Sequence, residues 1–224
     1  MKLSNETLSV LKNFSSINQG LEFKTGSKLR TMSASKSVLA EAVLKDSFPQ
    51  DFCVYDLNQF LSIHSSIGKD ADLTFDDKNI FFSSGKNKTY YRKTEKSMIV
   101  TPPDKELKLP SSEISFSLSE EELASILKAT AILQSPNISV QSDGDTVNIV
   151  SCNVEDSSAH TNSFRVGEGN GTSYKMVFLA DNLKLIPGSY DVEISSKGLS
   201  HFKNKNVDIQ YWVATEAKYS KYGA

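Results

Sequence analysis

Cysteine, histidine and tryptophan are scarce in this chain of 224 residues, which has two, three and one of them. Two cysteines cannot build a disulfide scaffold of several bridges or a cysteine-rich zinc site. Cys53 and Cys152 are flanked by apolar and β-forming residues, so we interpret them as reduced, partly buried thiols. His64, His160 and His201 have no second His, Cys or carboxylate beside them at metal-ligand spacing. We therefore expect no metal and no cofactor.

Long apolar runs are absent as well. No stretch approaches the roughly 20 residues that a helix needs to cross a bilayer, which predicts no membrane association. The opening Met-Lys-Leu-Ser-Asn-Glu-Thr carries an acid and soon turns polar, unlike a signal peptide. We expect a cytoplasmic protein.

A large excess of one charge sign is also missing. The chain has 25 Lys and Arg residues against 27 Asp and Glu residues, for a formal net charge of -2. This balance excludes a strongly basic nucleic-acid binder on total charge, but it permits a locally basic face.

Catalytic signatures do not occur either. The chain has no Gly-x-Ser-x-Gly, Walker-type loop or His-Glu-x-x-His. The glycine-rich segment at residues 167–171 runs into a strand pattern at 174–178, so we interpret it as a hairpin tip, because a phosphate-binding loop should open a helix. We predict that the protein is not an enzyme. An enzyme whose catalytic residues converge from distant segments is the least favoured alternative.

Two segments half a chain apart look alike. Residues 3–11 resemble residues 118–126, an offset of 118 − 3 = 115 residues. Each begins with a serine at a plausible helix N-cap, Ser4 or Ser119, followed by acids that suit the positive end of the helix dipole. Ser119 and Glu122 also complete a capping box. The same order of helix, strands, second short helix and strands follows in both halves.

The predicted elements are those of an α+β protein with two similar domains. Four helices are expected, one after each N-cap serine and a second in each half at residues 55–61 and 180–185. Hairpins are expected at residues 21–32 and 138–150, the latter turning at Asp143-Gly144. Further strands are expected at residues 38–44, 72–75, 80–83, 89–92, 163–166, 174–178, 190–194, 201–203 and 207–214. The proline-containing segment 96–113 is predicted to be an extended connector between domains at residues 1–95 and 114–224.

Several short motifs carry a resemblance to a known family. They are Met-Lys-Leu-Ser at residues 1–4, Leu-Lys-Asn-Phe at 11–14, Ile-Asn at 17–18, Tyr-Asp-Leu-Asn at 55–58, Phe-Leu-Ser-Ile at 60–63, Val-Glu-Asp-Ser at 154–157 and Pro-Gly-x-Tyr at 187–190. Together they resemble, over the whole chain, the sliding clamps of T-even-type bacteriophages, which are processivity factors of phage DNA polymerases. Residues 29–32 and 211–214 also look like segments of cellular clamps.

This resemblance implies a fold, an assembly and partners. It implies the DNA-clamp fold in a homotrimeric ring, with helices lining the hole, antiparallel sheets outside, and double-stranded DNA passing through without sequence specificity. It implies no catalysis. The expected partners are DNA polymerase, an ATP-dependent clamp loader and a late-transcription sigma-like factor, in the cytoplasm of an infected bacterial host. A non-enzymatic phage structural or assembly protein that self-associates through sheet edges is the alternative function.

A sliding ring needs mobile cations near DNA rather than contacts to base edges, and Lys suits this better than Arg. The candidates for the DNA-facing surface are Lys12, Lys128, Lys184, Lys2, Ser62 and Ser65. By the resemblance, Lys128 and Lys184 sit where clamps place basic residues, whereas Ala131 stands where a basic residue is expected. Each lysine taken alone fits a merely solvated helix face equally well. His64 occupies an apolar position, so we interpret it as a packing residue.

The resemblance also points to contacts with other chains. Ring closure would pair an edge strand at residues 89–93 with one at about 161–166 of the next subunit. The interface candidates are Thr89, Tyr90, Tyr91, Arg92, Phe164 and Arg165. The candidates for a partner-peptide pocket beside the connector are Met32, Val100, Leu107, Trp212 and Ala214. Ordinary edge strands and a core tryptophan are the alternatives. The tail at residues 218–222 is expected to be either disordered or partner-facing.

Overall fold

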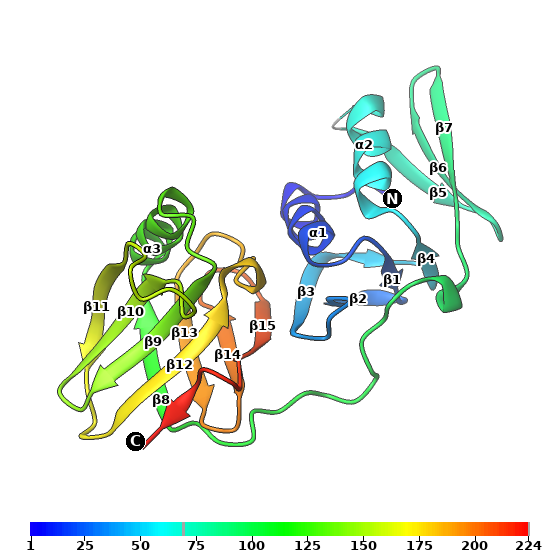
Figure 1. Cartoon of the computed structure of the whole chain (residues 1–224). Coiled ribbons are helices and arrows are strands. Elements are labelled where there is room, and N and C mark those ends of the chain that lie inside the picture. The colour runs from blue at the N-terminus through cyan, green and yellow to red at the C-terminus, as the bar shows by residue number, and fades with distance from the viewer. Residues whose placement is uncertain (69, 224) are drawn as a thin grey trace. The chain divides into compact units, whose positions relative to one another are not determined.

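The computed structural model describes residues 1–68 and 70–223, and it divides the chain into two compact units. Unit 1 is Met1–Asp104 and unit 2 is Lys105–Ala224. Each unit has its own sheets with helical segments packed against them (Figure 1). The division lies inside the segment predicted to be a connector, which holds one 3₁₀ turn, η1 at Lys96–Met98, and is otherwise largely irregular.

Unit 1 contains two helices and two antiparallel sheets. The helices are α1 at Asn5–Ile17 and α2 at Leu57–Ile67. One sheet has the strand order β4-β1-β2-β3, with β1 at Leu21–Phe23, β2 at Gly26–Met32, β3 at Val38–Phe48 and β4 at Phe52–Val54. The other has the order β5-β6-β7, with β5 at Asp72–Phe75, β6 at Asn79–Ser84 and β7 at Asn87–Arg92.

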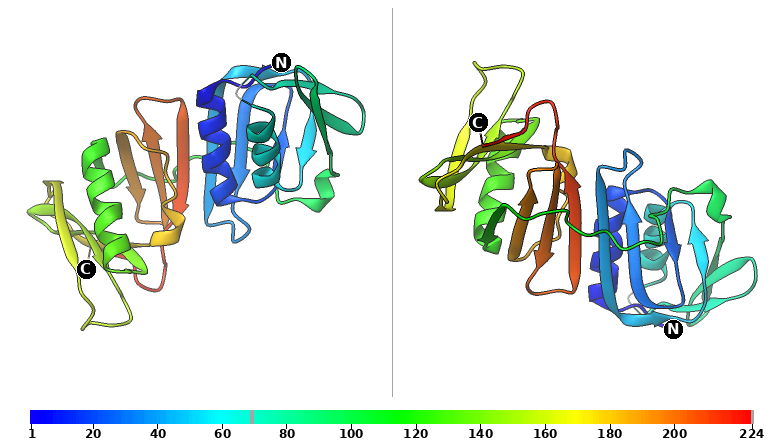
Figure 2. Two further views of the ribbon diagram at one scale, coloured as in Figure 1. Left: turned by 90° about the horizontal axis from the view of Figure 1, so that it is seen from above. Right: turned by 90° about the horizontal axis from the view of Figure 1, so that it is seen from below.

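The N-cap of α1 fixes where this helix begins. The Ser4 hydroxyl accepts a hydrogen bond from the Thr7 backbone N–H at 3.2 Å, and the Ser4 N–H donates to Asp46 at 2.6 Å. Val10, Leu11 and Phe14 are then buried along one stripe of the helix. α1 and α2 lie side by side (Figure 2), with α1 against β2 and β3 and α2 against β6 and β7.

An aromatic cluster joins the two sheets of unit 1. Phe23 stacks on Phe52 with ring centroids 4.4 Å apart and meets the edge of Phe48 at 4.7 Å. Phe60 of α2 bridges to Phe23 at 6.0 Å and to Phe82 of the second sheet at 5.0 Å. Such contacts between buried rings stabilise a core beyond the area that they bury.

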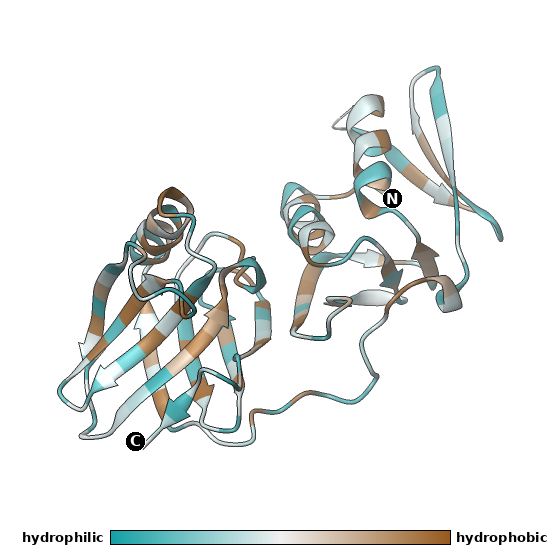
Figure 3. Ribbon diagram, in the orientation of Figure 1, coloured by the Kyte–Doolittle hydropathy of each residue, from teal (hydrophilic) through white to brown (hydrophobic). Residues whose placement is uncertain are grey.

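Unit 2 contains one α-helix, α3 at Glu120–Ile132, and two antiparallel sheets. One sheet has the order β15-β14-β13-β8, with β8 at Ile114–Leu118, β13 at Tyr190–Ser195, β14 at Leu199–Asn204 and β15 at Ile209–Ala214. The other has the order β11-β10-β9-β12-β16, with β9 at Asn137–Asp143, β10 at Thr146–Cys152, β11 at Asn162–Glu168, β12 at Ser173–Leu179 and β16 at Lys221–Tyr222. Apolar and polar residues alternate along several of these strands (Figure 3).

The capping box predicted for α3 is confirmed. The Ser119 hydroxyl accepts from the Glu122 N–H at 3.2 Å, and the Glu122 carboxylate accepts from the Ser119 N–H at 2.8 Å. Leu123, Ile126 and Thr130 are buried, and Thr130 also shares a hydrogen bond of 2.7 Å with Ser151 of β10. α3 therefore packs its buried stripe onto the five-stranded sheet.

The helix predicted at residues 180–185 is wrong beyond its first turn. A 3₁₀ turn, η2 at Ala180–Asn182, is followed by an irregular segment in which buried Leu183 and Leu185 flank exposed Lys184. This alternation is that of an extended chain, and Pro187 disfavours a helical conformation at the residue before it. The turn begins as α2 does: Ala180 N–H donates to Pro136 at 2.9 Å, and Leu57 N–H donates to Gln19 at 2.8 Å.

The C-terminal tail is ordered, which corrects one of the two expectations for it. β16 pairs with β12, placing Lys221 opposite Lys175 and Tyr222 opposite Tyr174. The two tyrosine rings stack with centroids 5.8 Å apart.

Candidate nucleic-acid interface and sheet edges

Three of the predicted DNA-facing residues lie on the paired helices of unit 1. Lys12 is exposed on α1, and Ser62 and Ser65 are exposed on α2. The Ser62 hydroxyl donates to the Asn58 carbonyl at 2.8 Å, one turn back in its own helix. The two helices thus present a polar surface with a single cation, since no other Lys or Arg lies on either helix.

Lys128 occupies in α3 nearly the place that Lys12 has in α1. Lys128 is exposed and lies 128 − 119 = 9 residues after its N-cap, whereas Lys12 lies 12 − 4 = 8 residues after its own. Acids fill the first turn of α3, at Glu120 to Glu122, and of α1, at Glu6. A phosphate group would therefore meet cations along the middle of each helix, while the acids disfavour its approach to the N-terminal turn.

The structure gives Lys184 and Lys2 different settings from those predicted. Lys184 is exposed, but it lies in the extended segment after η2, so its prediction as a helix-face residue is wrong. Lys2 pairs with Asp72 of β5 through the backbone, and its ammonium lies 3.4 Å from the Asp70 carboxylate. This carboxylate offsets part of the charge of Lys2, which weakens Lys2 as a contact to DNA.

The predicted interface strand β7 is the edge of its three-stranded sheet. Tyr90 is 65% exposed and Arg92 is exposed, so both can meet another chain. Tyr91 is buried, and its hydroxyl accepts a hydrogen bond from the Asp56 N–H at 2.9 Å. Consecutive residues of a strand face opposite ways, so the Tyr91 side chain faces the core and only its backbone is available for the strand pairing predicted here. Burial raises the pKa of its phenol.

The second predicted interface strand, β11, is the edge of the five-stranded sheet. Phe164 lies opposite Ile149 and is half-buried, while Arg165 is exposed and forms an ion pair of 2.5 Å with Glu168. No strand pairs with the outer edge of β7 or β11 in the described part of the chain. Their backbone groups can therefore form ladders with another chain.

The residues of the predicted peptide pocket belong to both units. Met32 and Val100 lie in unit 1, and Leu107, Trp212 and Ala214 lie in unit 2. Within unit 2, the Trp212 ring is buried and stacks on His201, with centroids 5.0 Å apart and planes 20° apart. The His201 ring is held in turn by Gln210 at 2.9 Å. The pocket itself stays a prediction.

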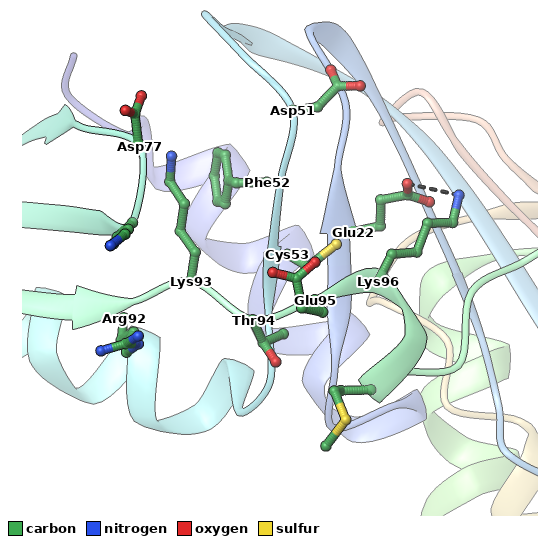
Figure 4. Close-up of a pocket in the computed structure, with 12 residues that line it drawn as sticks. Glu22, Asp51, Phe52, Cys53, Asp77, Arg92, Lys93, Thr94, Glu95 and Lys96 are labelled. Carbon is green, nitrogen blue, oxygen red and sulfur yellow. Dashed lines mark ion pairs between the residues drawn. The ribbon is translucent and has the colours of Figure 1, made fainter.

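A cavity that the sequence did not predict lies in unit 1 and has a volume of about 580 Å³ (Figure 4). Glu22 and Lys96 form an ion pair of 2.8 Å on its wall, and Lys93 lies beside the Phe52 ring. Burial, and secondarily the negative charge of Glu22, raises the pKa of the Cys53 thiol. A raised pKa disfavours the thiolate, which is the nucleophilic and metal-binding form of cysteine.

His64 is a packing residue, as the sequence indicated. It is buried in α2, with its ring 6.3 Å from that of Phe82. Burial lowers the pKa of its imidazole, which favours the neutral form.

Among residues 1–68 and 70–223, no group of three His, Cys, Asp or Glu side chains is placed to hold a metal ion. Within the same residues, no helix has the length and apolar character needed to cross a membrane.

Comparison with known proteins covers both units. The family model described as DNA polymerase processivity factor matches residues 4–101, and that of the C-terminal part of the gp45 sliding clamp matches residues 115–217. The sliding clamp of Vibrio phage KVP40 is 33% identical over 97% of this chain and 100% of its own length. That of Escherichia phage RB69 is 30% identical over 97% of both chains.

Solved structures extend the likeness to the fold. PCNA from Thermococcus kodakaraensis has a TM-score of 0.65 at 13% identity, covering 96% of this chain and 98% of its own. PCNA from Entamoeba histolytica has a TM-score of 0.61 at 14% identity, covering 93% and 94%. These likenesses show the clamp fold of two similar domains. Together with the phage relatives they do not favour the alternative of a structural or assembly protein.

Proposed function

This chain belongs to the sliding clamps, the family of phage DNA polymerase processivity factors, and we propose that three copies of it close into a ring around double-stranded DNA. The family is non-enzymatic, so the protein acts by holding the polymerase on its template. The observation that carries the proposal is the match to a phage sliding clamp along the full length of both chains.

The charge pattern supports sliding rather than gripping. Each chain brings few cations on its helices, Lys12 on α1 and Lys128 on α3, while its net charge is -2. A surface that neutralises few phosphates binds DNA weakly, and its affinity falls steeply with salt. We propose that encirclement, not binding energy, retains the protein on DNA, with Lys184, Lys2, Ser62 and Ser65 completing the lining.

The open sheet edges support closure of the ring. We propose that β7 of one copy pairs with β11 of the next, which gives each copy one edge of each kind and generates a closed, head-to-tail assembly. Thr89, Tyr90, Arg92, Phe164 and Arg165 are the residues proposed at this contact.

The expected partners follow from membership of the family. We propose that an ATP-dependent clamp loader opens the ring, that DNA polymerase docks beside Met32, Val100, Leu107, Trp212 and Ala214, and that a late-transcription sigma-like factor uses the same ring. The place of action is then the cytoplasm of an infected bacterial host.

The assembly is tested by mass in solution together with a change at one edge. Light scattering at micromolar concentration is expected to give three times 24.7 kDa. Phe164→Asp puts a charge at the outer edge of β11 and is expected to give single chains. Val150→Asp, at another half-buried position one strand further in, is the matched control and should leave the mass unchanged. A wild-type protein of single-chain mass at every concentration would contradict the proposal.

A further inference from the structure

The outer edge of β12 is covered by the C-terminal segment at residues 216–223, which pairs with it over only two residues. An edge strand presents a row of backbone N–H and C=O groups that can pair with any extended chain. In unit 2 that row belongs to Ser173, Lys175 and Val177, which face away from β9, and residues 216–223 satisfy it.

Residues 216–223 form few backbone hydrogen bonds with β12, and these fall at the residues whose backbone groups face outward. The Gly223 N–H donates to the Ser173 carbonyl at 2.9 Å, and Lys221 pairs with Lys175. At Val177 the ladder stops being regular: its N–H donates to the Ser220 hydroxyl at 3.0 Å, and its carbonyl accepts from the Glu216 N–H at 2.7 Å. The paired stretch, β16, is therefore only two residues long on a strand of seven.

Side chains hold the same segment in place. The Tyr222 ring stacks on that of Tyr174, with planes 15° apart. The Tyr219 hydroxyl donates to Glu155, in the connection between β10 and β11, at 2.6 Å. The outer edge of β12 therefore binds an aromatic ring, stacked on Tyr174, as well as backbone groups.

Unit 1 shows that the fold does not require such a cover. The strand that corresponds to β12 is β4, and the chain leaving the last strand of unit 1 touches it at one bridge, where the Thr94 N–H donates to the Cys53 carbonyl at 3.0 Å. The chain then continues into η1 without pairing further with β4. In unit 2 the corresponding chain turns back along β12 instead.

We propose that the outer edge of β12 is a strand-addition site for an extended polypeptide, and that the C-terminal tail is its resident occupant. The partner that fits is an extended segment that forms backbone hydrogen bonds with Lys175 and Val177 and lays an aromatic ring on Tyr174. Because the tail pairs regularly with only two residues of β12, a longer extended segment can form a more continuous ladder along this strand. While the tail stays bound, the edge is closed to other chains.

The test uses a chain ending at Thr215 and a fluorescein-labelled peptide of residues 214–223 as the probe. Fluorescence anisotropy is expected to show at least tenfold tighter binding to the shortened chain than to the full chain. A peptide of scrambled order and the peptide with Tyr222→Ala should bind more weakly. Lys175→Pro in the shortened chain removes the N–H at the middle of the edge and should abolish binding. Equal binding to both chains, or binding that survives Lys175→Pro, would overturn the proposal.

A full-length variant guards against misfolding of the shortened chain. Lys221→Pro keeps every other residue and removes the tail's own N–H donor opposite Lys175. The amides of Lys175 and Val177 should then exchange with deuterium faster, while those of Val147 and Ile149 in β10 keep their rates. The variant should also bind the labelled peptide. Unchanged exchange and no peptide binding would count against a displaceable tail.

Discussion

Unit 1 and unit 2 repeat one order of elements, but they close their cores differently. In unit 1, an eleven-residue helix, α2, sends Phe60, His64 and Ile67 into the core. In unit 2, a single 3₁₀ turn and an extended segment bring Leu183 and Leu185 to the corresponding place. The same burial is thus reached by a helical stripe in one repeat and by strand-like alternation in the other. What the core requires is apolar side chains at that place, not a particular backbone.

This difference changes the surfaces of the two units. Unit 1 presents two polar helix faces, with Ser62 and Ser65 on the second. In the described part of unit 2, α3 is the one α-helix. Its last residue, Ile132, is 70% exposed, and Leu179 of β12 is 40% exposed. We infer that the two repeats contribute unequally to the proposed DNA-facing surface.

The largest expected effect would come from removing an anchor of α2. Phe60→Ala should lower the free energy of unfolding by about 3–5 kcal/mol, because it leaves a cavity in the aromatic cluster. Leu185→Ala, its counterpart in unit 2, should cost about 2–5 kcal/mol. Urea unfolding followed by the single tryptophan and by circular dichroism measures both. A loss below about 1 kcal/mol for Phe60→Ala would show that α2 does not close the core.

A second expected effect is a dependence of stability on pH that arises from His64 in unit 1. The pKa of buried His64 is lowered in the folded protein, so the unfolded chain binds the proton more tightly. Stability is therefore complete above the ordinary imidazole pKa and falls as pH drops below it. When the pH is lowered from 7.5 to 5.5, the melting temperature of His64→Leu should fall less than that of the wild type. Parallel pH curves for the two proteins would contradict the assignment.

Removing the N-cap of α1 or of α3 should have smaller effects on stability, and the two effects should be similar in size. Ser119→Ala should cost about 1 kcal/mol, within the range for lost N-caps, because it removes the hydroxyl that accepts from the Glu122 N–H and donates to the Glu122 carboxylate. Ser4→Ala removes a hydroxyl that accepts from the Thr7 N–H and donates to the Thr7 hydroxyl, both at 3.2 Å. Neither of these bonds involves a charged group, so the loss should be somewhat smaller. Thermal unfolding of the two variants checks this order. A larger loss for Ser4→Ala would place the stronger cap in unit 1.

Changing the lysines should have the smallest effect on stability. Lys12→Ala and Lys128→Ala should each stay within about 0.5 kcal/mol of wild type, since both side chains are exposed. Each should reduce the salt dependence of DNA association by about one unit of slope. Filter binding at several salt concentrations measures this, with Lys36→Ala, an exposed turn residue, as the control. An unchanged slope for both variants would remove them from the lining.

The sequence predicts most of this fold where local chemistry and pattern agree. Asp143-Gly144 predicts the β9–β10 turn because Gly144 adopts a φ of +106°, and Ser119 with Glu122 predicts the start of α3. Residues 180–185 were predicted to be a helix because an acid near the start and leucines after it also suit a helix. The two-residue spacing of Leu183 and Leu185, which is typical of an extended chain, is too short a pattern to exclude a helix. β4 and β16 are too short, at three and two residues, to show a period.

Less of the candidate site than of the fold could be predicted from the sequence. Exposure of Lys12 and Lys128 follows from helix periodicity, because each lies opposite a buried stripe. Alternation along β7 allows only one of Tyr90 and Tyr91 to face outward, but it does not say which; the hydrogen bond to Asp56 decides this. The tail's place on β12 depends on contacts between segments about 45 residues apart, which no local pattern encodes.

We propose above all that the protein stays on DNA by surrounding it. The most direct measurement loads labelled protein onto nicked circular DNA with a clamp loader and ATP, isolates the complex, and then cuts the circle once. The account predicts that the protein remains on the circle in high salt and leaves within seconds of cutting. Equal retention on cut and uncut DNA, or loss from the circle at the same rate, would contradict it.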